Sequence, residues 1–522
     1  MEAAARKSRR RSDRKAGSKS QSRRRLAARR RRVRLAFGRT HFGAANLADK
    51  RRTDRLVKVA DQIMAHPAGT LPQKLKNPSD LEALYRLANT PTVTHAAVTA
   101  SHHALTRQAM ADHGGTLLLV HDTTELDYSG LRATQGLGPI GNGTCRGYLC
   151  HNSLAVEPAT RRVLGLANQI LHTRRKVPRH ETPARRRDHP DRESRLWKCG
   201  CGACVLPPPG VAAPMTATRV IDVCDAGADA FELFDYERAN GRWFLIRAGK
   251  DRWTGLRPPR LLGGEEARAA ESVKLKLYAY TRRLEDLGGR YVSVSAGTNK
   301  RNGKNLKLKQ TARLAKVRIA AGPVALPVPV KPRGEHADAP LNCWVVHVRE
   351  VDPPPGQNPL EWVLLTNVPA DTLEQAAERV DWYACRATVE EYHKAMKSGC
   401  GIEQLQFMTR AALEPMIGLL SIAAVALLQL RQAARRPDAK DTPATTFVPR
   451  DSVRVLSAWR LGRPKMDMSV YDFYLALARL GGHQNRKSDG PPGWLTLWRG
   501  FNDLQLMLMG VYAMRLEKCD ER

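Results

Sequence analysis

The chain has 522 residues, and 86 lysines and arginines against 51 aspartates and glutamates give it a formal net charge of +35. This length predicts more than one domain, and this charge predicts a polyanionic partner such as DNA. No apolar segment follows the basic N-terminus. The longest apolar run, 416–430, is shorter than the roughly 20 residues that a bilayer requires and is expected to form a buried helix. We therefore expect a cytoplasmic protein with reduced cysteines and no contact with a membrane.

Residues 1–36 form a low-complexity segment rich in arginine and serine. Sixteen basic residues against two acidic ones give residues 1–34 a net charge of +14, which leaves +21 for the rest of the chain. We expect a disordered basic arm that binds polyanions. Since the remainder is also basic, the folded part should bind a polyanion as well.

Residues 37–112 have a helical pattern and are expected to form a helical N-terminal region. Arg51, Arg52 and Arg55 stand at the start of the first long helix, where the helix dipole disfavours cations. Positive charge at this end indicates a ligand, and DNA phosphate is the favoured one. A solvated helix face is the alternative interpretation.

The apolar run 117–120 predicts a buried strand, the run R-V-I-D-V-C at 219–224 is a second strand candidate, and each is followed by an aspartate. The run 117–120 precedes H-D-T-T-E-L-D-Y, which contains Asp122, and the run 219–224 precedes D-A-G-A-D, which begins with Asp225. An aspartate at such a position is often only a turn former or a helix cap. The two carboxylates indicate a catalytic site only if a third carboxylate lies near them.

The segment between these strands, 174–216, is rich in arginine and proline and is expected to form an exposed loop. It contains Cys199, Cys201 and Cys204 in the pattern C-x-C-x2-C. A structural zinc site requires four ligands, usually from C-x2-C pairs. His180, His189 or Cys224 would be candidates for the fourth ligand, but free thiols are the favoured interpretation.

Residues 241–368 are rich in β-branched and aromatic residues and predict a β-rich block, after which the chain returns to helices. Residues 383–397 read Y-A-C-R-A-T-V-E-E-Y-H-K-A-M-K. On a helix, Tyr383, Arg386, Glu390 and Lys397 would share an arc of roughly 60°. A carboxylate can hold a hard divalent cation while Arg and Lys bind phosphate beside it. This pattern favours phosphoryl transfer on a nucleic acid; i,i+4 ion pairs on a solvated face are the alternative.

Phosphoryl transfer with two metal ions needs about three carboxylates from separate elements. Asp122 and Asp225 would come from two strands and Glu390 from a helix. We therefore expect these three side chains to converge and to bind two Mg²⁺ (or Mn²⁺) ions.

Three motifs resemble those of bacterial insertion-sequence transposases of the DDE class, namely V-H-D-T-T-E-L, V-C-D-A-G-A-D and Y-x2-R-x3-E-x6-K. The resemblance is to the IS-four type, the group around the Tn-five transposase. Further matching segments are L-A-D-K-R-R-T-D-R-L-V-K-V-A, P-L-E-W-V-L-L-T, E-E-Y-H-K-A-M-K-S-G-C-G-I-E, L-A-R-L-G-G and W-L-T-L-W-R-G-F-N-D-L-Q. The similarity covers the chain from about residue 46 to residue 515.

The resemblance implies an α/β fold, with an RNase H-like catalytic core (113–240 and 369–436) interrupted by a β-rich insertion (241–368). It also implies an N-terminal DNA-binding domain at 37–112 and a helical C-terminal dimerisation domain at 450–522. The implied activity is metal-dependent cleavage at the element ends, with passage through a hairpin, followed by strand transfer into target DNA. The partners would be end and target DNA and a second copy of the chain in the end-paired complex, in the bacterial cytoplasm at the nucleoid.

The same resemblance implies which residues hold the substrate. Tyr383, Arg386 and Lys397 would contact phosphates near the cleavage point, Lys394 would contact DNA, and Trp362 would hold a flipped base. A tryptophan of the sheet core is the alternative interpretation of Trp362. The residue after Arg386 is Ala387, where the group has a tryptophan, so one aromatic wall of the base pocket is missing.

Two other functions stay open: an inactive transposase-derived DNA-binding protein or inhibitor, and an RNase H-like nuclease without strand transfer.

Overall fold

The computed structural model describes residues 36–520 except 66–68, 76, 209, 211–215, 256–274, 295–296, 301–306, 330–336, 338 and 487–491. All but the last residue of the predicted basic arm, 1–36, therefore lies outside the described residues. The chain divides into two compact units, here called the helical unit and the sheet unit. The helical unit takes in the described parts of Met1–Leu105, Tyr128–Leu137 and Glu391–Arg522, and the sheet unit takes in Thr106–Asp127 and Gly138–Glu390.

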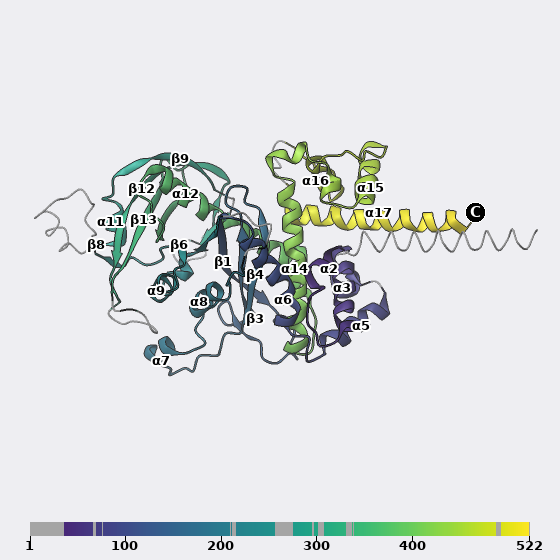
Figure 1. Ribbon diagram of the computed structural model, residues 1–522, viewed down its shortest axis with the longest axis horizontal. Coiled ribbons are helices and arrows are strands. Elements are labelled where there is room, and N and C mark those ends of the chain that lie inside the picture. The colour runs from purple at the N-terminus through teal and green to yellow at the C-terminus, as the bar shows by residue number, and fades with distance from the viewer. Residues whose placement is uncertain are drawn as a thin grey trace, which may run out of the picture. The chain divides into compact units, whose positions relative to one another are not determined.

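The sheet unit is built on a mixed sheet whose described strands run in the order β2-β3-β1-β5-β6-β14-β13-β12-β9, with β4 paired to β3 (Figure 1). Strands β1, β5 and β6 are parallel to one another, and the flanking pairs are antiparallel. The bounds are β1 Gly115–Asp127, β2 Gly138–Ile140, β3 Cys145–Val156, β4 Val163–His172, β5 Thr218–Cys224, β6 Trp243–Arg247, β9 Asp286–Val294, β12 Arg313–Leu326, β13 Leu341–Glu350 and β14 Glu361–Thr366.

Two small sheets and several helices complete this unit. The small sheets pair β7 (Trp253–Thr254) with β8 (Leu275–Lys276), and β10 (Gly297–Lys300) with β11 (Lys307–Gln310). The helices are α7 Pro183–Asp188, α8 Arg195–Gly202, the 3-10 turn η1 Ala226–Ala228, α9 Phe231–Ala239, α11 Leu277–Thr281 and α12 Leu373–Ala384, followed by α13 Ala387–Lys394, which crosses into the helical unit. The fold is therefore mixed α/β. Strands β6, β9, β12, β13 and β14 fall within 241–368 and continue the same sheet; the boundaries expected for an insertion there stay a prediction.

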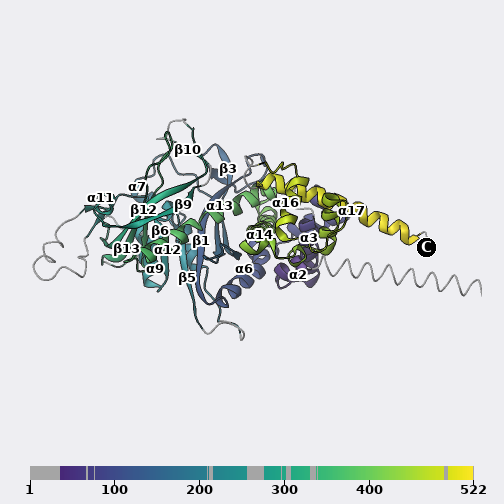
Figure 2. The ribbon, with the colours of Figure 1, turned by 90° about the horizontal axis from the view of Figure 1, so that it is seen from above.

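Helices cover both faces of the sheet. Successive side chains of a strand point to opposite faces, so the contacts of neighbouring residues on β14 show which helix covers which face. Val363 and Leu365 of β14 share a buried cluster with Phe234 of α9. The alternate residue Trp362 contacts Tyr383 of α12 instead, with ring centroids 4.9 Å apart. Helices α9 and α12 therefore pack against opposite faces, and Figure 2 shows both beside β6. Helix α12 begins at a capping box formed by Thr372 and Gln375.

Helix α8 lies in the segment that was expected to form an exposed loop. Its residues Leu196, Trp197 and Cys201 are buried, with Trp197 and Cys201 in the same cluster as α9. The expectation was wrong here because the composition of 174–216 as a whole is dominated by prolines and arginines near its two ends, whereas a short amphipathic helix lies between them. The helix places part of the C-x-C-x2-C pattern inside the core.

The helical unit begins with α2 Ala36–Phe42, α3 Lys50–Ala65, α4 Leu71–Lys74 and α5 Pro78–Ala88, followed by α6 His95–Ala111, whose last turns belong to the sheet unit. Helix α3 is amphipathic and buries Leu56, Val59 and Ile63. After α13 come a π-helical turn, η2 Ala395–Gly399, a 3-10 turn, η3 Ile402–Gln404, and the long helix α14 Arg410–Ala433.

Helix α14 is long and apolar enough to cross a bilayer by length and composition, but 83% of its most apolar window is buried. Ser421 lies within it at 0% exposure, and its backbone oxygen accepts a hydrogen bond from Tyr392. Helices α3 and α5 also contact it. Burial of this kind identifies α14 as a core helix, as the sequence predicted.

The C-terminal part of this unit consists of α15 Arg450–Leu461, α16 Val470–Leu480 and α17 Trp494–Asp520, preceded by the 3-10 turns η4 Pro437–Lys440 and η5 Ala444–Thr446. These turns bury Ala439 and Ala444. Helices α16 and α17 cross closely, because a Cβ on Gly500 would lie 1.8 Å from the backbone oxygen of Leu477. The glycine is required by that approach.

Candidate active site

Asp122 and Asp225 occupy equivalent positions on two neighbouring parallel strands. The register pairs Val120 of β1 with Val223 of β5, and each aspartate follows two residues later. Strand β1 continues past this point, so Asp122 lies in mid-strand opposite Asn152 of β3 rather than at a strand end. Asp225 caps η1, and its Oδ1 accepts a hydrogen bond of 2.7 Å from the backbone of Gly227. The two carboxylates are therefore held at one level of the sheet by rigid backbone.

The segment 383–397 is not the single helix that its periodicity predicted. Helix α12 ends at Ala384 and α13 begins at Ala387, and the link is closed by tight i to i−3 hydrogen bonds from Arg386 and Thr388. A third bond of this kind joins Val389 to Arg386. Arg386 lies at the break and points to the sheet.

One guanidinium contacts all three predicted carboxylates. Arg386 Nη1 donates a hydrogen bond of 3.2 Å to Asp122 Oδ2 and another of 3.0 Å to Glu390 Oε1. Its Nη2 lies 3.8 Å from Asp225 Oδ2. The structure thus brings the three side chains together from β1, from the turn after β5, and from α13.

Exposure and charge differ among the three carboxylates. The side chain of Asp122 is 14% exposed, that of Asp225 31% and that of Glu390 54%. Burial raises the pKa of Asp122 to about 6; Arg386 opposes the shift, and the charges of Asp225 and Glu390 add to it. Burial disfavours the charged form of Arg386, but its anionic neighbours, Asp122 first, outweigh burial and raise its pKa. The site therefore has more negative charge than one arginine neutralises, which favours binding of further cations.

Tyr383 and Trp362 form an aromatic pair beside this site. Their rings are 4.9 Å apart and inclined by 70°, an edge-to-face arrangement. Tyr383 is buried at 4% exposure, which raises its pKa, whereas Arg386 and Arg247 lower it through charge and hydrogen bonding. Trp362 is half-buried. The tyrosine phenol thus touches cations within the protein, and only the tryptophan retains exposed ring surface.

Arg247 is a residue of this site that the sequence analysis missed. It ends β6, which is parallel to β5, so it lies at the same edge of the sheet as Asp225. The signal was present in R-W-F-L-I-R, a strand with a basic residue at its carboxyl end. Carboxyl ends of neighbouring parallel strands meet at one edge, where ligands bind in α/β sheets.

Lys394 and Lys397 fall in the helical unit, just after Glu390, so their contacts with DNA near the carboxylates stay a prediction. Lys394 is exposed at the end of α13, and Lys397 Nζ lies 3.4 Å from Glu403 Oε1. Both residues follow the boundary between the units by only a few positions.

The three arginines of α3 have different environments. Arg51 is 92% exposed and pairs at 3.0 Å with Asp49, which precedes the helix. Arg52 donates hydrogen bonds to the backbone oxygen of Leu47 and to Thr92 Oγ1, so it ties α3 to the loop before α6. Arg55 donates a hydrogen bond of 2.8 Å to the buried carboxylate of Asp80. Arg51 is thus the most available of the three for a DNA phosphate.

Residues 36–93 match a family model described as transposase DNA-binding. The match covers α2 to α5, including Arg51, Arg52 and Arg55. It supports a transposase family for the chain and DNA as its partner.

Proposed function

We propose that this chain is a DNA transposase that cleaves DNA at the ends of its element and joins the freed 3′ ends to target DNA. The observation that carries the proposal is the contact of Arg386 with Asp122, Asp225 and Glu390. The three residues are far apart in the chain and come from three elements. They meet in a protein whose N-terminal segment matches a transposase DNA-binding family.

The carboxylates fit two Mg²⁺ or Mn²⁺ ions. Hard divalent cations prefer carboxylate oxygens, and three carboxylates meet here around a single guanidinium. Two such ions supply activation of the attacking oxygen and stabilisation of the leaving oxygen. Asp122 and Asp225 would hold them on the rigid sheet, and Glu390 would do so from α13.

The cationic and aromatic groups around the carboxylates are proposed to hold DNA. Arg247 lies at the sheet edge and Arg386 is within reach of all three carboxylates, so both are placed for phosphate oxygens of the cleaved strand. Trp362 is proposed to stack on an unpaired base. Lys394, Lys397, Arg51, Arg52 and Arg55 remain candidates for contacts elsewhere on the DNA.

The finer architecture belongs to the same proposal. We infer an RNase H-like core that contains β1, β5 and Glu390, with the strands of 241–368 as an insertion between Asp225 and Glu390. Helices α15 to α17 would form the dimerisation region of the end-paired complex. The working site of such a protein is the bacterial nucleoid.

The experiment uses the full chain and linear DNA that carries the inverted repeats flanking its coding region. With Mg²⁺ or Mn²⁺ we expect nicking at the repeat boundary and joining of the 3′ end to a supercoiled target. Glu390→Gln should bind the repeats and cleave nothing. Glu361→Gln, on β14 in the same unit, is a matched control that should cleave normally, because its partner is His347.

Two outcomes would overturn the proposal in favour of its alternatives. Binding of the repeats without nicking in either metal identifies an inactive transposase-derived protein or inhibitor. Nicking without joining of any 3′ end identifies a nuclease. Cleavage by Glu390→Gln at the wild-type rate would instead remove Glu390 from the active site.

A further inference from the structure

A second polar cluster lies on the opposite face of the strands that carry Asp122 and Asp225. His121 precedes Asp122 on β1, so its side chain points to the other face. Asp222 of β5 is paired with Leu119, which places it on the same face as His121. Helix α8 covers this face and contributes Cys201. Three residues capable of binding a metal therefore meet behind the carboxylate site.

The three ligand atoms converge on one point in the core. His121 Nε2 lies 2.8 Å from Asp222 Oδ1 and 3.6 Å from Cys201 Sγ. All three atoms lie within 4.8 Å of one another, and the side chains are buried at 0% to 1% exposure. Ligands of a tetrahedral zinc ion, with bonds of about 2.0 to 2.3 Å, are separated by comparable distances.

The surroundings orient the histidine for this role. Ser153 Oγ lies 2.9 Å from His121 Nδ1, so Nδ1 has a hydrogen-bond partner and Nε2 is directed at Asp222 and Cys201. In metal sites, a hydrogen bond to the ring nitrogen that does not bind the metal fixes the orientation of the histidine ring. Helix α8 comes this close because Gly200 has no side chain: a Cβ there would lie 2.4 Å from His151 Nε2.

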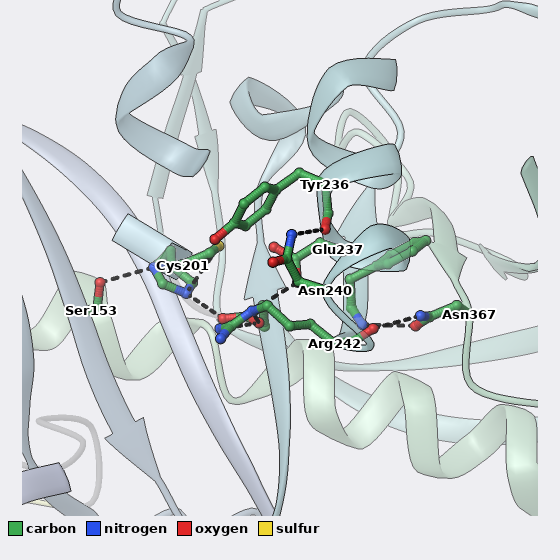
Figure 3. Close-up of polar contacts among 10 residues, drawn as sticks. Ser153, Cys201, Tyr236, Glu237, Asn240, Arg242 and Asn367 are labelled. Atoms are coloured by element: carbon green, nitrogen blue, oxygen red, sulfur yellow. Dashed lines mark hydrogen bonds and ion pairs between the residues drawn. The ribbon is translucent and has the colours of Figure 1, made fainter. Parts of the chain in front are cut away.

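Glu237 is a candidate for a fourth ligand. Glu237 of α9 is fully buried, and its Oε1 has no hydrogen-bond partner among the described residues. Its Oε2 accepts a hydrogen bond from Arg242, which also pairs with Asp222 at 2.6 Å. Figure 3 shows Ser153, Cys201, Glu237 and Arg242 around this buried polar cluster. A buried acceptor without a partner is costly unless something binds it.

Two buried carboxylates share one guanidinium in this cluster. Arg242 lies 2.6 Å from Asp222 Oδ2 and 3.1 Å from Glu237 Oε2. A cation bound beside the two carboxylates would supply a second positive charge within the core.

We propose that His121, Cys201 and Asp222 bind a structural Zn²⁺ ion, with the Glu237 carboxylate as the fourth ligand. Nitrogen, thiolate and carboxylate ligands in a tetrahedral arrangement suit zinc, whereas Mg²⁺ prefers oxygen alone. The ion would tie β1, β5, α8 and α9 together directly behind Asp122 and Asp225. It would therefore brace the backbone that positions the two aspartates.

The assignment differs from the zinc-binding pattern that the sequence alone suggests. A C-x-C-x2-C motif implies that its three cysteines act together, but Cys199 is exposed and is absent from the metal-competent cluster. Cys201 is the one member that reaches His121. A pocket of about 540 Å³ is lined by Gly202, Cys204, Tyr236 and Arg242, the last of which pairs with Asp222.

The test measures metal content without DNA or cleavage, so it is independent of the proposed transposase activity. The full chain is purified without a polyhistidine tag, washed with a chelator that removes weakly bound Mg²⁺ and Mn²⁺, and analysed for zinc. We expect about one Zn²⁺ per chain. Substitution by Co²⁺ should produce a thiolate-to-cobalt charge-transfer band. Wild-type protein that retains no zinc and shows no such band overturns the proposal, whatever the variants do.

Matched variants then identify the ligands. Cys201→Ser should hold at least about tenfold less zinc than wild type and lose the charge-transfer band. Cys199→Ser, two residues away on the same helix, should keep both. Glu237→Gln should weaken zinc retention while Cys224→Ser does not; the reverse result overturns the assignment of the fourth ligand. Equal loss in Cys199→Ser and Cys201→Ser would overturn the site in favour of the C-x-C-x2-C motif.

Discussion

Arg386 Nη1 lies 3.2 Å from Asp122 Oδ2, which joins the break between α12 and α13 to the middle of β1. The same guanidinium reaches Asp225 and Glu390. Arg386 therefore supplies the positive charge at a point where the proposed mechanism places divalent cations. Removing it should make the protein more dependent on those cations.

We expect Arg386→Gln to destabilise the metal-free protein by about 3 kcal/mol, since it leaves the buried Asp122 carboxylate without its cation. Mn²⁺ should then raise the Tm of the variant more than that of wild type, because the metal replaces the lost charge. Calorimetry with and without Mn²⁺ measures both effects. Arg290→Gln, which breaks the exposed pair with Asp381, is the control and should cost less than about 1 kcal/mol. An Arg386→Gln protein that responds to Mn²⁺ no more than wild type contradicts the account.

The arginines of α3 should separate DNA contact from folding. Arg51→Ala removes an exposed side chain, so the slope of log K against log salt should fall by about 1 with no loss of stability. Arg55→Ala weakens the buried Asp80 network and should lower stability. Arg86→Ala, an exposed i,i+4 pair on α5, is the control for charge. Titrations at several salt concentrations decide the matter, and an unchanged slope in Arg51→Ala would remove this residue from the DNA interface.

Trp362 is expected to act on DNA rather than only on packing. Its ring is half-buried against Tyr383, so Trp362→Phe should preserve most of the packing, whereas Trp362→Ala should lose it. With 2-aminopurine placed at the cleaved end, wild type should raise the fluorescence as the base unstacks. Trp362→Ala should lose the rise while still binding the ends. A full rise in a folded Trp362→Ala protein would assign the tryptophan to the sheet core.

A pH effect is expected where α2 meets α6. His41 Nδ1 lies 2.9 Å from His102 Nδ1, and burial lowers the pKa of His41 to about 4 and that of His102 well below its usual value. Below pH 6.5 these two histidines therefore bind protons in the unfolded chain but stay neutral in the folded chain. Stability is present above pH 6.5 and is lost as pH falls towards 4; the His41 share is about 2 kcal/mol at pH 5.

Hydrogen exchange of the α2 amides, corrected for intrinsic rates, measures this local stability. Protection should fall between pH 7 and pH 5 in wild type and fall less in His41→Gln. Equal protection of wild-type α2 at both values would show that the pair does not control the segment.

The sequence predicted some of these features because they depend on local patterns. The apolar run 117–120 and the alternating run 219–224 both became central strands, and the 416–430 run became a buried helix. The proximity of Asp122 and Asp225 follows from two adjacent parallel strands in register. That register is set by tertiary packing, and no single run of residues contains it.

Other features were not readable for physical reasons. Residues 383–397 include neither glycine nor proline, so nothing local marks the break at Arg386, which brings that side chain to the carboxylates. Strand β3 was missed because it buries His151, Asn152 and Ser153, polar residues that a pattern of hydrophobicity places on a surface. Burial of such groups depends on partners from distant elements, such as His121.

The most direct test of the central claim is single-turnover cleavage of end DNA in Mn²⁺ by Asp122→Asn, Asp225→Asn, Glu390→Gln and the triple variant. If the three carboxylates act as one centre, each single variant should lose nearly as much rate as the triple variant, with end binding unchanged. Cleavage within about tenfold of wild type by any single variant, or losses that simply multiply, would contradict the account.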